Sequence, residues 1–259
     1  MAENLNSAIV IPARRNSTRL PDKMLLAETG RPLVVHTVEA AAANTKTDQI
    51  IVATDDDLIF ETVEGFGHPV EMTSSEHQSG TDRVAEVARR HPEFEIVVNL
   101  QGDEPAISGA AIDLAIDMLQ QNPEAMVSTL ATPIRSRAML EDPACVKVVL
   151  DSTGQALYFS RSPIPHVRGS DSTDPLPKAV GGEGKSEFLQ HVGLYAYRRE
   201  LLLKYSNLPP CPMETLESLE QLRVLFAGYS ICVGIIDEPL CGIDTPEDYA
   251  LFVRNWASG

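Results

Sequence analysis

The chain has 259 residues, of which 43% are hydrophobic and 22% charged, so it can bury one large core or two small ones. This balance is typical of a globular protein and excludes a mainly disordered chain. The formal charge of −16 argues against a general nucleic-acid-binding role or binding to an anionic membrane. No apolar run approaches the ~18 residues that a membrane helix needs.

The N-terminal segment and the cysteines indicate the compartment. The segment MAENLN is polar and acidic, so it lacks the basic start and long apolar core of a secretion signal. The four cysteines, Cys145, Cys211, Cys232 and Cys241, are widely spaced without a CxxC pair, which argues against a zinc site or a disulfide framework. We expect a cytoplasmic protein whose reduced cysteines pack in the core.

In the first half of the chain, short runs rich in Val and Ile alternate with helical stretches. Strands are predicted at residues 8–12, 49–53, 95–100, 125–131 and 146–150, and such runs are typical of buried parallel strands. Helices are predicted at residues 32–44, 81–90 and 109–121. This order predicts β-α-β units and an α/β three-layer sandwich whose strand ends form one ligand-binding edge.

The second half is less regular. Strands are predicted at residues 156–160, 192–197 and 231–236, one helix at 214–226, and another from about Pro246. Residues 166–187 form a long polar stretch rich in Gly, Pro and Ser, which indicates a flap or a linker.

A basic loop follows the first predicted strand. Residues 12–31 carry a net charge of +3, with the cations Arg14, Arg15, Arg19, Lys23 and Arg31. Small polar residues in this loop, among them Asn16, Ser17 and Thr18, can expose backbone N–H groups, while Arg and Lys bind phosphate oxygens. The position predicts an anion site, although a solvated basic loop would look similar. Neither a GxxxxGK[ST] loop nor a GxGxxG fingerprint is present.

Three acidic motifs could bind a divalent cation. Asp103, in NLQGDEP, follows the most apolar strand, but a Gly-Asp turn explains it equally well. Asp244, in CGIDTPEDY, could be a second ligand, whereas the spacing alone favours a helix cap. Asp55 and Asp57 form a D-x-D pattern that suits a metal-bound nucleotide sugar, and helix capping is again the simpler explanation.

The motif HQSGTDR joins a polar loop to a helix. Gly80 permits close approach of a ligand, Thr81 offers a hydroxyl, and Arg83 could contact a base or a ribose. An N-capped helix with a surface arginine is the alternative.

Polar residues in the second half suit an acidic sugar. Arg161 could bind its carboxylate, and His191 and Tyr195 have strand-like spacing. Glu214 and Gln221 are spaced to share one helix face with Glu217, where they could accept hydrogen bonds from hydroxyls; surface pairing or core polarity would explain each residue separately.

Eight segments occur in a fixed order: PARRNSTRLPDK, HQSGTDR, NLQGDEP, VKVVL, ALYFSRSPIP, HVGLYAYR, LEQLR and GIDTPEDY. Together they resemble the 3-deoxy-manno-octulosonate cytidylyltransferase family, the CMP-Kdo synthetases of Gram-negative lipopolysaccharide synthesis, over about residues 8–253. HQSGTDR and NLQGDEP in tandem are specific to this resemblance. One departure is Asp22, where glycine is common in the family.

The resemblance implies a single cytidylyltransferase domain over residues 1–259 with a nucleotidyltransferase fold. Its nucleotide and metal core would span about 8–150 and 228–256, and its sugar-site and dimerisation portion about 151–227. The implied protein is a cytoplasmic homodimer that transfers CMP from CTP to the anomeric hydroxyl of 3-deoxy-D-manno-octulosonate (Kdo) and releases pyrophosphate.

The resemblance also implies roles for individual residues. Catalysis would depend on Arg14, Lys23, Asp103 and Asp244, with Mg²⁺ held by the two aspartates. CTP would be bound by Arg14, Ser17, Lys23, Gln78, Gly80, Thr81, Arg83 and Gln101. The sugar would be bound by Arg161, His191, Tyr195, Glu214 and Gln221.

Three other functions remain compatible with the residues. A cytidylyltransferase for a sialic acid or an amino-substituted Kdo would look nearly identical. A glycosyltransferase would use the D-x-D pattern and consume a nucleotide sugar. A non-catalytic nucleotide sensor would need neither Asp103 nor Asp244.

Overall fold

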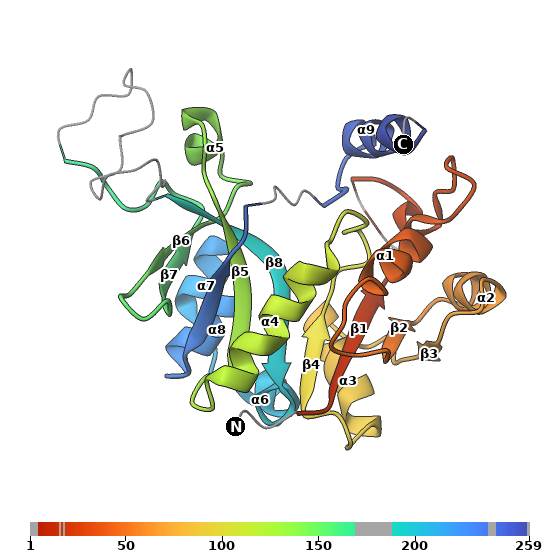
Figure 1. Ribbon diagram of the computed structural model, residues 1–259, viewed down its shortest axis with the longest axis horizontal. Coiled ribbons are helices and arrows are strands. Elements are labelled where there is room, and N and C mark those ends of the chain that lie inside the picture. Colours follow the sequence, from red (N-terminus) through yellow and green to blue (C-terminus); the bar gives the residue numbers. More distant parts are fainter. Residues whose placement is uncertain (1–4, 16, 18, 169–187, 238–241, 258–259) are drawn as a thin grey trace.

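The computed structural model describes residues 5–15, 17, 19–168, 188–237 and 242–257. Asn16, Thr18, Cys241 and most of the polar stretch 166–187 lie outside the described residues. The described strands form one nine-stranded sheet with helices on both faces, which confirms the α/β sandwich (Figure 1).

The sheet has two parallel parts joined by an antiparallel strand. Its strands are β1 (Ser7–Ala13), β2 (Ile50–Thr54), β3 (Val70–Met72), β4 (Ile96–Asn99), β5 (Val127–Pro133), β6 (Lys147–Leu150), β7 (Ala156–Ser160), β8 (Leu189–Arg198) and β9 (Ile231–Ile235). The order is β3-β2-β1-β4-β8-β5-β9. Strands β1 to β4 run parallel, as do β5 and β9, and β8 is antiparallel to both β4 and β5.

The prediction that residues 146–150 form a parallel strand is wrong. Strand β6 pairs antiparallel with β7 and with β8. Only a short turn, within residues 151–155, separates β6 from β7, whereas a parallel pair needs a crossover of about a dozen residues. The segment β6-β7 is therefore a hairpin beside the main sheet.

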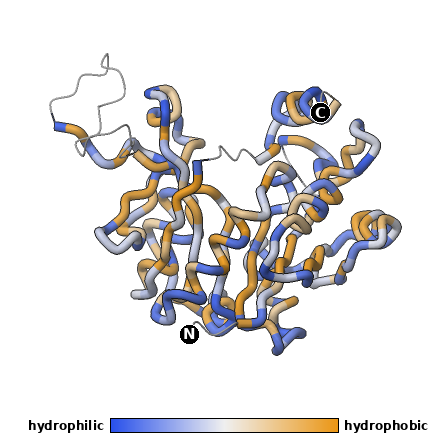
Figure 2. Tube along the Cα trace, in the orientation of Figure 1, coloured by the Kyte–Doolittle hydropathy of each residue, from blue (hydrophilic) through white to orange (hydrophobic). Residues whose placement is uncertain are grey.

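Helices cover the two faces of the sheet according to the alternation of its side chains. The helices are α1 (Leu33–Ala41), α2 (Asp57–Gly65), α3 (Gly80–Arg90), α4 (Gly109–Gln121), α5 (Arg137–Glu141), α6 (Arg199–Lys204), α7 (Pro212–Glu217), α8 (Gln221–Phe226) and α9 (Pro246–Trp256). Ile9 and Ile11 of β1 pack in a core with α1, α2 and α4, while Ala8 and Val10 pack in a second core with α3, α6 and α8. Figure 2 shows the hydrophobic residues concentrated along the central strands.

The single helix predicted at residues 214–226 is wrong, because the chain breaks it into α7 and α8 at Ser218. Ser218 has φ 52°, a left-handed conformation that ends α7. The break leaves Leu216 85% exposed, although its spacing predicts a buried position beside Leu219 and Leu222. Arg161 donates to the carbonyl oxygens of Glu217 (2.7 Å) and Ser218 (3.3 Å), which stabilises the helix end.

Helix α9 begins where the sequence places it and packs on α1. Thr245 caps it in a capping box with Asp248. The His36 ring of α1 contacts Phe252 and Trp256, with ring centroids 5.1 and 4.4 Å away. These contacts fix the segment that precedes α9 close to the carboxyl edge of the sheet.

Two further observations bear on the sequence predictions. Cys145, Cys211 and Cys232 are buried and form no disulfide. In the described part of the chain, every helix is too short or too polar to cross a bilayer.

Candidate active site

The amine of Lys23 lies between two carboxylates at the carboxyl edge of the sheet. Lys23 begins a 3-10 helix (Lys23–Leu25) after the basic loop, Asp103 follows β4, and Asp244 precedes α9. Lys23 Nζ contacts Asp103 Oδ2 and lies 3.1 Å from Asp244 Oδ1. The fold thus brings together three residues that the sequence analysis placed in one site.

Asp22 sets the entry to this site. It has φ 50°, in the left-handed region where glycine is unstrained, and its carboxylate accepts from Arg15 Nε at 2.8 Å. The departure from the family's glycine therefore keeps the same kind of turn.

Asp244 is free of the capping role that spacing alone favoured. Thr245 Oγ1 accepts from the backbone N–H of Asp248 at 3.2 Å and so caps α9. The Asp244 carboxylate instead faces Lys23 and Arg19, whose Nη2 lies 3.0 Å from Asp244 Oδ2. Asp244 can therefore act as a ligand while its neighbour ends the loop.

Glu104 is a member of this acidic group to which the sequence analysis gave no role. Its Oε2 is buried without a hydrogen-bond partner among the described residues. Burial, followed by the nearby charges of Asp103 and Asp244, raises the pKa of Glu104 to about 7. A Cβ on Gly242 would lie 2.8 Å from Glu104 Oε1, so the C-terminal segment packs directly on this carboxyl group.

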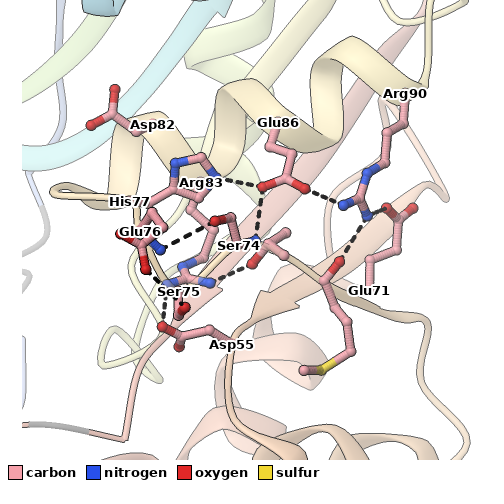
Figure 3. Close-up of polar contacts among 12 residues, drawn as sticks. Asp55, Glu71, Ser74, Ser75, Glu76, His77, Asp82, Arg83, Glu86 and Arg90 are labelled. Carbon is pink, nitrogen blue, oxygen red and sulfur yellow. Dashed lines mark hydrogen bonds and ion pairs between the residues drawn. The ribbon is translucent and has the colours of Figure 1, made fainter.

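Arg14 is held by the loop that precedes α3. Its guanidinium donates to the carbonyl oxygens of His77 (3.0 Å) and Gln78 (3.4 Å). Glu86 of α3 fixes that loop, because it accepts from Ser74 N at 3.0 Å and contacts His77 Nε2 (Figure 3). The loop therefore aims Arg14, through residues that carry no recognisable signal in the sequence.

Arg83 does not lie on the surface of α3. Its side chain is fully buried, with Nη2 2.9 Å from Asp55 Oδ2, and it donates to Thr73 Oγ1 (Figure 3). In this arrangement Arg83 is committed to the core, which departs from the expected contact with a base or ribose.

The same contacts account for the D-x-D pattern. Asp55 is the partner of Arg83, Asp56 caps α2 by accepting from Ile59 N at 3.0 Å, and Asp57 lies in the first turn of that helix. These acids stabilise local structure, so nothing in their geometry favours a metal-bound nucleotide sugar.

A chain of side-chain hydrogen bonds crosses from β4 to α8. Gln101 Nε2 donates to Asn99 Oδ1 (3.0 Å), Asn99 Nδ2 to Thr81 Oγ1 (3.4 Å), and Thr81 Oγ1 to Glu220 Oε2 (3.1 Å). Burial raises the pKa of Glu220. A Cβ on Gly80 would lie 3.8 Å from Gln101 Oε1, so Gly80, Thr81 and Gln101 lie together as predicted.

The remaining nucleotide residues lie in the two loops. Gln78 Nε2 donates to the Glu76 carbonyl oxygen at 3.0 Å, and Ser17 Oγ accepts from Leu20 N at 3.3 Å.

His191 and Tyr195 lie on β8, and Tyr195 stands opposite Asn99 of β4. The His191 ring packs against Phe159 and Tyr195, and its Nε2 lies 2.9 Å from Thr129 Oγ1. Burial lowers the pKa of His191 to about 3 and raises that of Tyr195. Both rings are therefore neutral hydrogen-bonding groups near neutral pH.

The other predicted sugar residues are engaged elsewhere or buried. Glu214 forms a two-point ion pair with Arg223, with N–O distances of 2.7 and 2.6 Å. Gln221 is 4% exposed and its Nε2 has no hydrogen-bond partner among the described residues. The predicted common face of Glu214, Glu217 and Gln221 is wrong, because the break at Ser218 separates their helices.

A parallel α/β edge that carries a basic loop against paired carboxylates defines a nucleotide-dependent transferase. A family model described as cytidylyltransferase matches residues 8–231. The chain belongs to the cytidylyltransferase family, and its curated relatives place it among the 3-deoxy-manno-octulosonate cytidylyltransferases.

The similarity extends over nearly the whole chain. The 3-deoxy-manno-octulosonate cytidylyltransferase of Rhodopirellula baltica is 44% identical over 94% of this chain and 96% of its own length. That of Geobacter sulfurreducens is 46% identical, with the same coverage of both chains. A solved CMP:2-keto-3-deoxy-manno-octonic acid synthetase complexed with CTP is 39% identical, has a TM-score of 0.88, and covers 98% of this chain and 99% of its own.

Proposed function

We propose that this enzyme transfers CMP from CTP to the anomeric hydroxyl of Kdo, giving CMP-Kdo and pyrophosphate for lipopolysaccharide biosynthesis. The observation that carries the proposal is the convergence of Lys23, Asp103 and Asp244 beside a basic loop. The names of the full-length relatives support the nucleotide and the sugar acid.

Asp103 and Asp244 would hold Mg²⁺. Their carboxylate oxygens converge on one cation, and oxygen ligands suit Mg²⁺. No group of three or more His, Cys, Asp or Glu side chains in the described ranges is arranged to hold a metal. A set of two carboxylates fits Mg²⁺, which commonly takes its remaining ligands from water and substrate phosphates. When bound, the ion would neutralise charge on the triphosphate.

The basic loop would bind the triphosphate. Arg14, held by two carbonyl oxygens, presents a fixed guanidinium, and Lys23 adds a point charge; Ser17 would contribute a hydroxyl. The anomeric oxygen of the sugar attacks the α-phosphorus and pyrophosphate leaves, so no side chain needs to form a covalent intermediate. Catalysis would rest on positioning and on neutralising charge.

Tyr195 and His191 would contact the sugar acid as neutral donors or acceptors, since β8 brings them to the edge near Asn99. Arg161 would pair with the sugar carboxylate only by exchanging its bonds to the carbonyl oxygens of Glu217 and Ser218.

We propose that the single domain has its nucleotide and metal core at about residues 8–150 and 228–256, and that residues 151–227 supply the sugar site and the contact surface of a cytoplasmic homodimer. Leu157 and Leu216 in this portion are 61% and 85% exposed, which suits an apolar contact. Light scattering of the purified protein would test the dimer.

The test of the reaction is pyrophosphate release from CTP in the presence of Mg²⁺, with Kdo, amino-substituted Kdo and N-acetylneuraminate compared in one panel. Release with Kdo alone is expected. Release only with another acid would move the substrate to a related sugar, and no release with any of the three would contradict the proposed reaction.

A further inference from the structure

The contacts of Lys23 differ from those of its neighbours in the basic loop. Its side chain is 8% exposed and bridges two carboxylates, Asp103 and Asp244. Arg19, by contrast, is 66% exposed and reaches only the outer oxygen of Asp244. The buried position means that water screens the charge of Lys23 far less than that of Arg19.

The oxygens that Lys23 contacts are the ones that face inward. They are Asp103 Oδ2 and Asp244 Oδ1, and Arg19 pairs with the other oxygen of Asp244. Before any ligand binds, the charges of Lys23 and Arg19 balance those of the two aspartates. A divalent cation that uses the inward oxygens must therefore displace an ammonium that already satisfies them, at a cost that opposes its own attraction.

We propose that Lys23 is an internal counter-ion: it holds Asp103 and Asp244 together before substrate binds and competes with the divalent cation for their oxygens. A nucleotide triphosphate supplies the negative charge that draws Lys23 away from the pair. Metal and nucleotide then raise each other's affinity, because a coupling between two sites is reciprocal. This inference rests on the proposed assignment of the metal to Asp103 and Asp244.

The test measures Mn²⁺ binding to the full-length protein without nucleotide, by calorimetry or by the spin-resonance signal of free Mn²⁺. Lys23→Met is expected to bind Mn²⁺ at least about tenfold more tightly than wild type, or ~1.4 kcal/mol. Lys23→Arg retains the charge and should remain as weak as wild type. No gain in affinity for Lys23→Met would overturn the proposal.

Two controls separate direct competition from a general change in charge. Arg15→Met removes an exposed cation that pairs with Asp22, so it should leave Mn²⁺ affinity unchanged. Arg19→Met removes the exposed partner of Asp244 and should change the affinity by about two- to threefold at most, the effect of a weak surface pair. A gain from Arg19→Met equal to that from Lys23→Met would also contradict direct competition.

A further variant distinguishes failure of this inference from failure of the metal site. Adding Asp103→Asn to Lys23→Met should abolish the gain. If the double variant binds Mn²⁺ as tightly as Lys23→Met, the proposed metal site is wrong. If Asp103→Asn weakens Mn²⁺ binding but Lys23→Met does not strengthen it, only the competition is wrong. Thermal unfolding confirms that each variant folds, and Lys23→Gln replaces Lys23→Met if the latter does not.

Discussion

Arg83 and Asp55 form an ion pair with an Nη2 to Oδ2 distance of 2.9 Å, in which the arginine side chain is fully buried. The pair joins α3 to the end of β2, and Thr73 accepts a second bond from the same guanidinium. The first turn of α3 is thereby fixed to the sheet, next to the loop that holds Arg14.

Replacing Asp55 by alanine is expected to destabilise the fold by about 3–5 kcal/mol, because it leaves the buried charge of Arg83 without its partner. Urea unfolding checks this value. Asp57→Ala is the matched control, since Asp57 lies in the first turn of α2, and it should cost no more than ~1 kcal/mol. Equal stability of the two variants, with activity lost only in Asp55→Ala, would instead support a ligand-binding role for the D-x-D pattern.

Replacing Asp103 by alanine should lower turnover by several orders of magnitude while the protein remains folded. The carboxylate contacts Lys23 at the centre of the site, and removing it eliminates one of the two proposed metal ligands. Steady-state pyrophosphate release and circular dichroism test both halves of the prediction. A near wild-type rate would remove Asp103 from the site.

Glu86→Ala is expected to raise the KM for CTP about tenfold, or ~1.4 kcal/mol, with a smaller change in kcat. The variant frees the loop whose carbonyl oxygens hold Arg14, although Glu86 itself lies outside the triphosphate site. Glu64→Ala, on the exposed face of α2, serves as the control. An unchanged KM would show that the loop holds its shape without Glu86.

His191 should make stability depend on pH in the acid range. An unfolded histidine gains a proton as the pH falls through about 6.5, whereas the folded pKa of His191 is about 3. Stability contributed above pH 6.5 is therefore lost between pH 6.5 and 3, at up to about 1.4 kcal/mol per pH unit. In urea titrations, His191→Gln should lose less stability over this window than wild type. His166→Gln, at an exposed position, should follow wild type.

Gly109→Ala is expected to destabilise the protein by about 1–3 kcal/mol or more, because the new Cβ would lie 2.2 Å from the carbonyl oxygen of Ala43. The obstacle is backbone, so it cannot turn aside as a side chain can. Gly65→Ala is the helical control: nothing lies within 4 Å of its Cβ position, and the change should be neutral or stabilising by about 1 kcal/mol. Equal midpoints in thermal unfolding would contradict the clash.

The sequence predicted the parallel part of the fold because continuous Val and Ile runs between helical stretches are found where both faces of a sheet are covered. It could not predict the direction of β8, because side-chain alternation is the same for a strand running either way. The break at Ser218 has no glycine or proline to mark it, and it depends on Arg161, which lies 57 residues earlier along the chain.

The site was predictable where charge departed from the composition of the chain. A basic loop in an acidic protein and acids after apolar strands located Lys23, Asp103 and Asp244. Burial was not predictable. The core position of Arg83 requires Asp55 from another element, and the raised pKa of Glu104 requires the segment at Gly242 to pack on it.

The position of Asp244, one residue before the cap of α9, has a consequence for the order in which the protein matures on the ribosome. The basic loop and Asp103 emerge in the first half of synthesis, but the second carboxylate arrives only near its end and is fixed only when α9 docks on His36. Nascent chains can therefore build most of the sheet while remaining chemically silent. The docking of a single terminal helix is the event that switches on the enzyme.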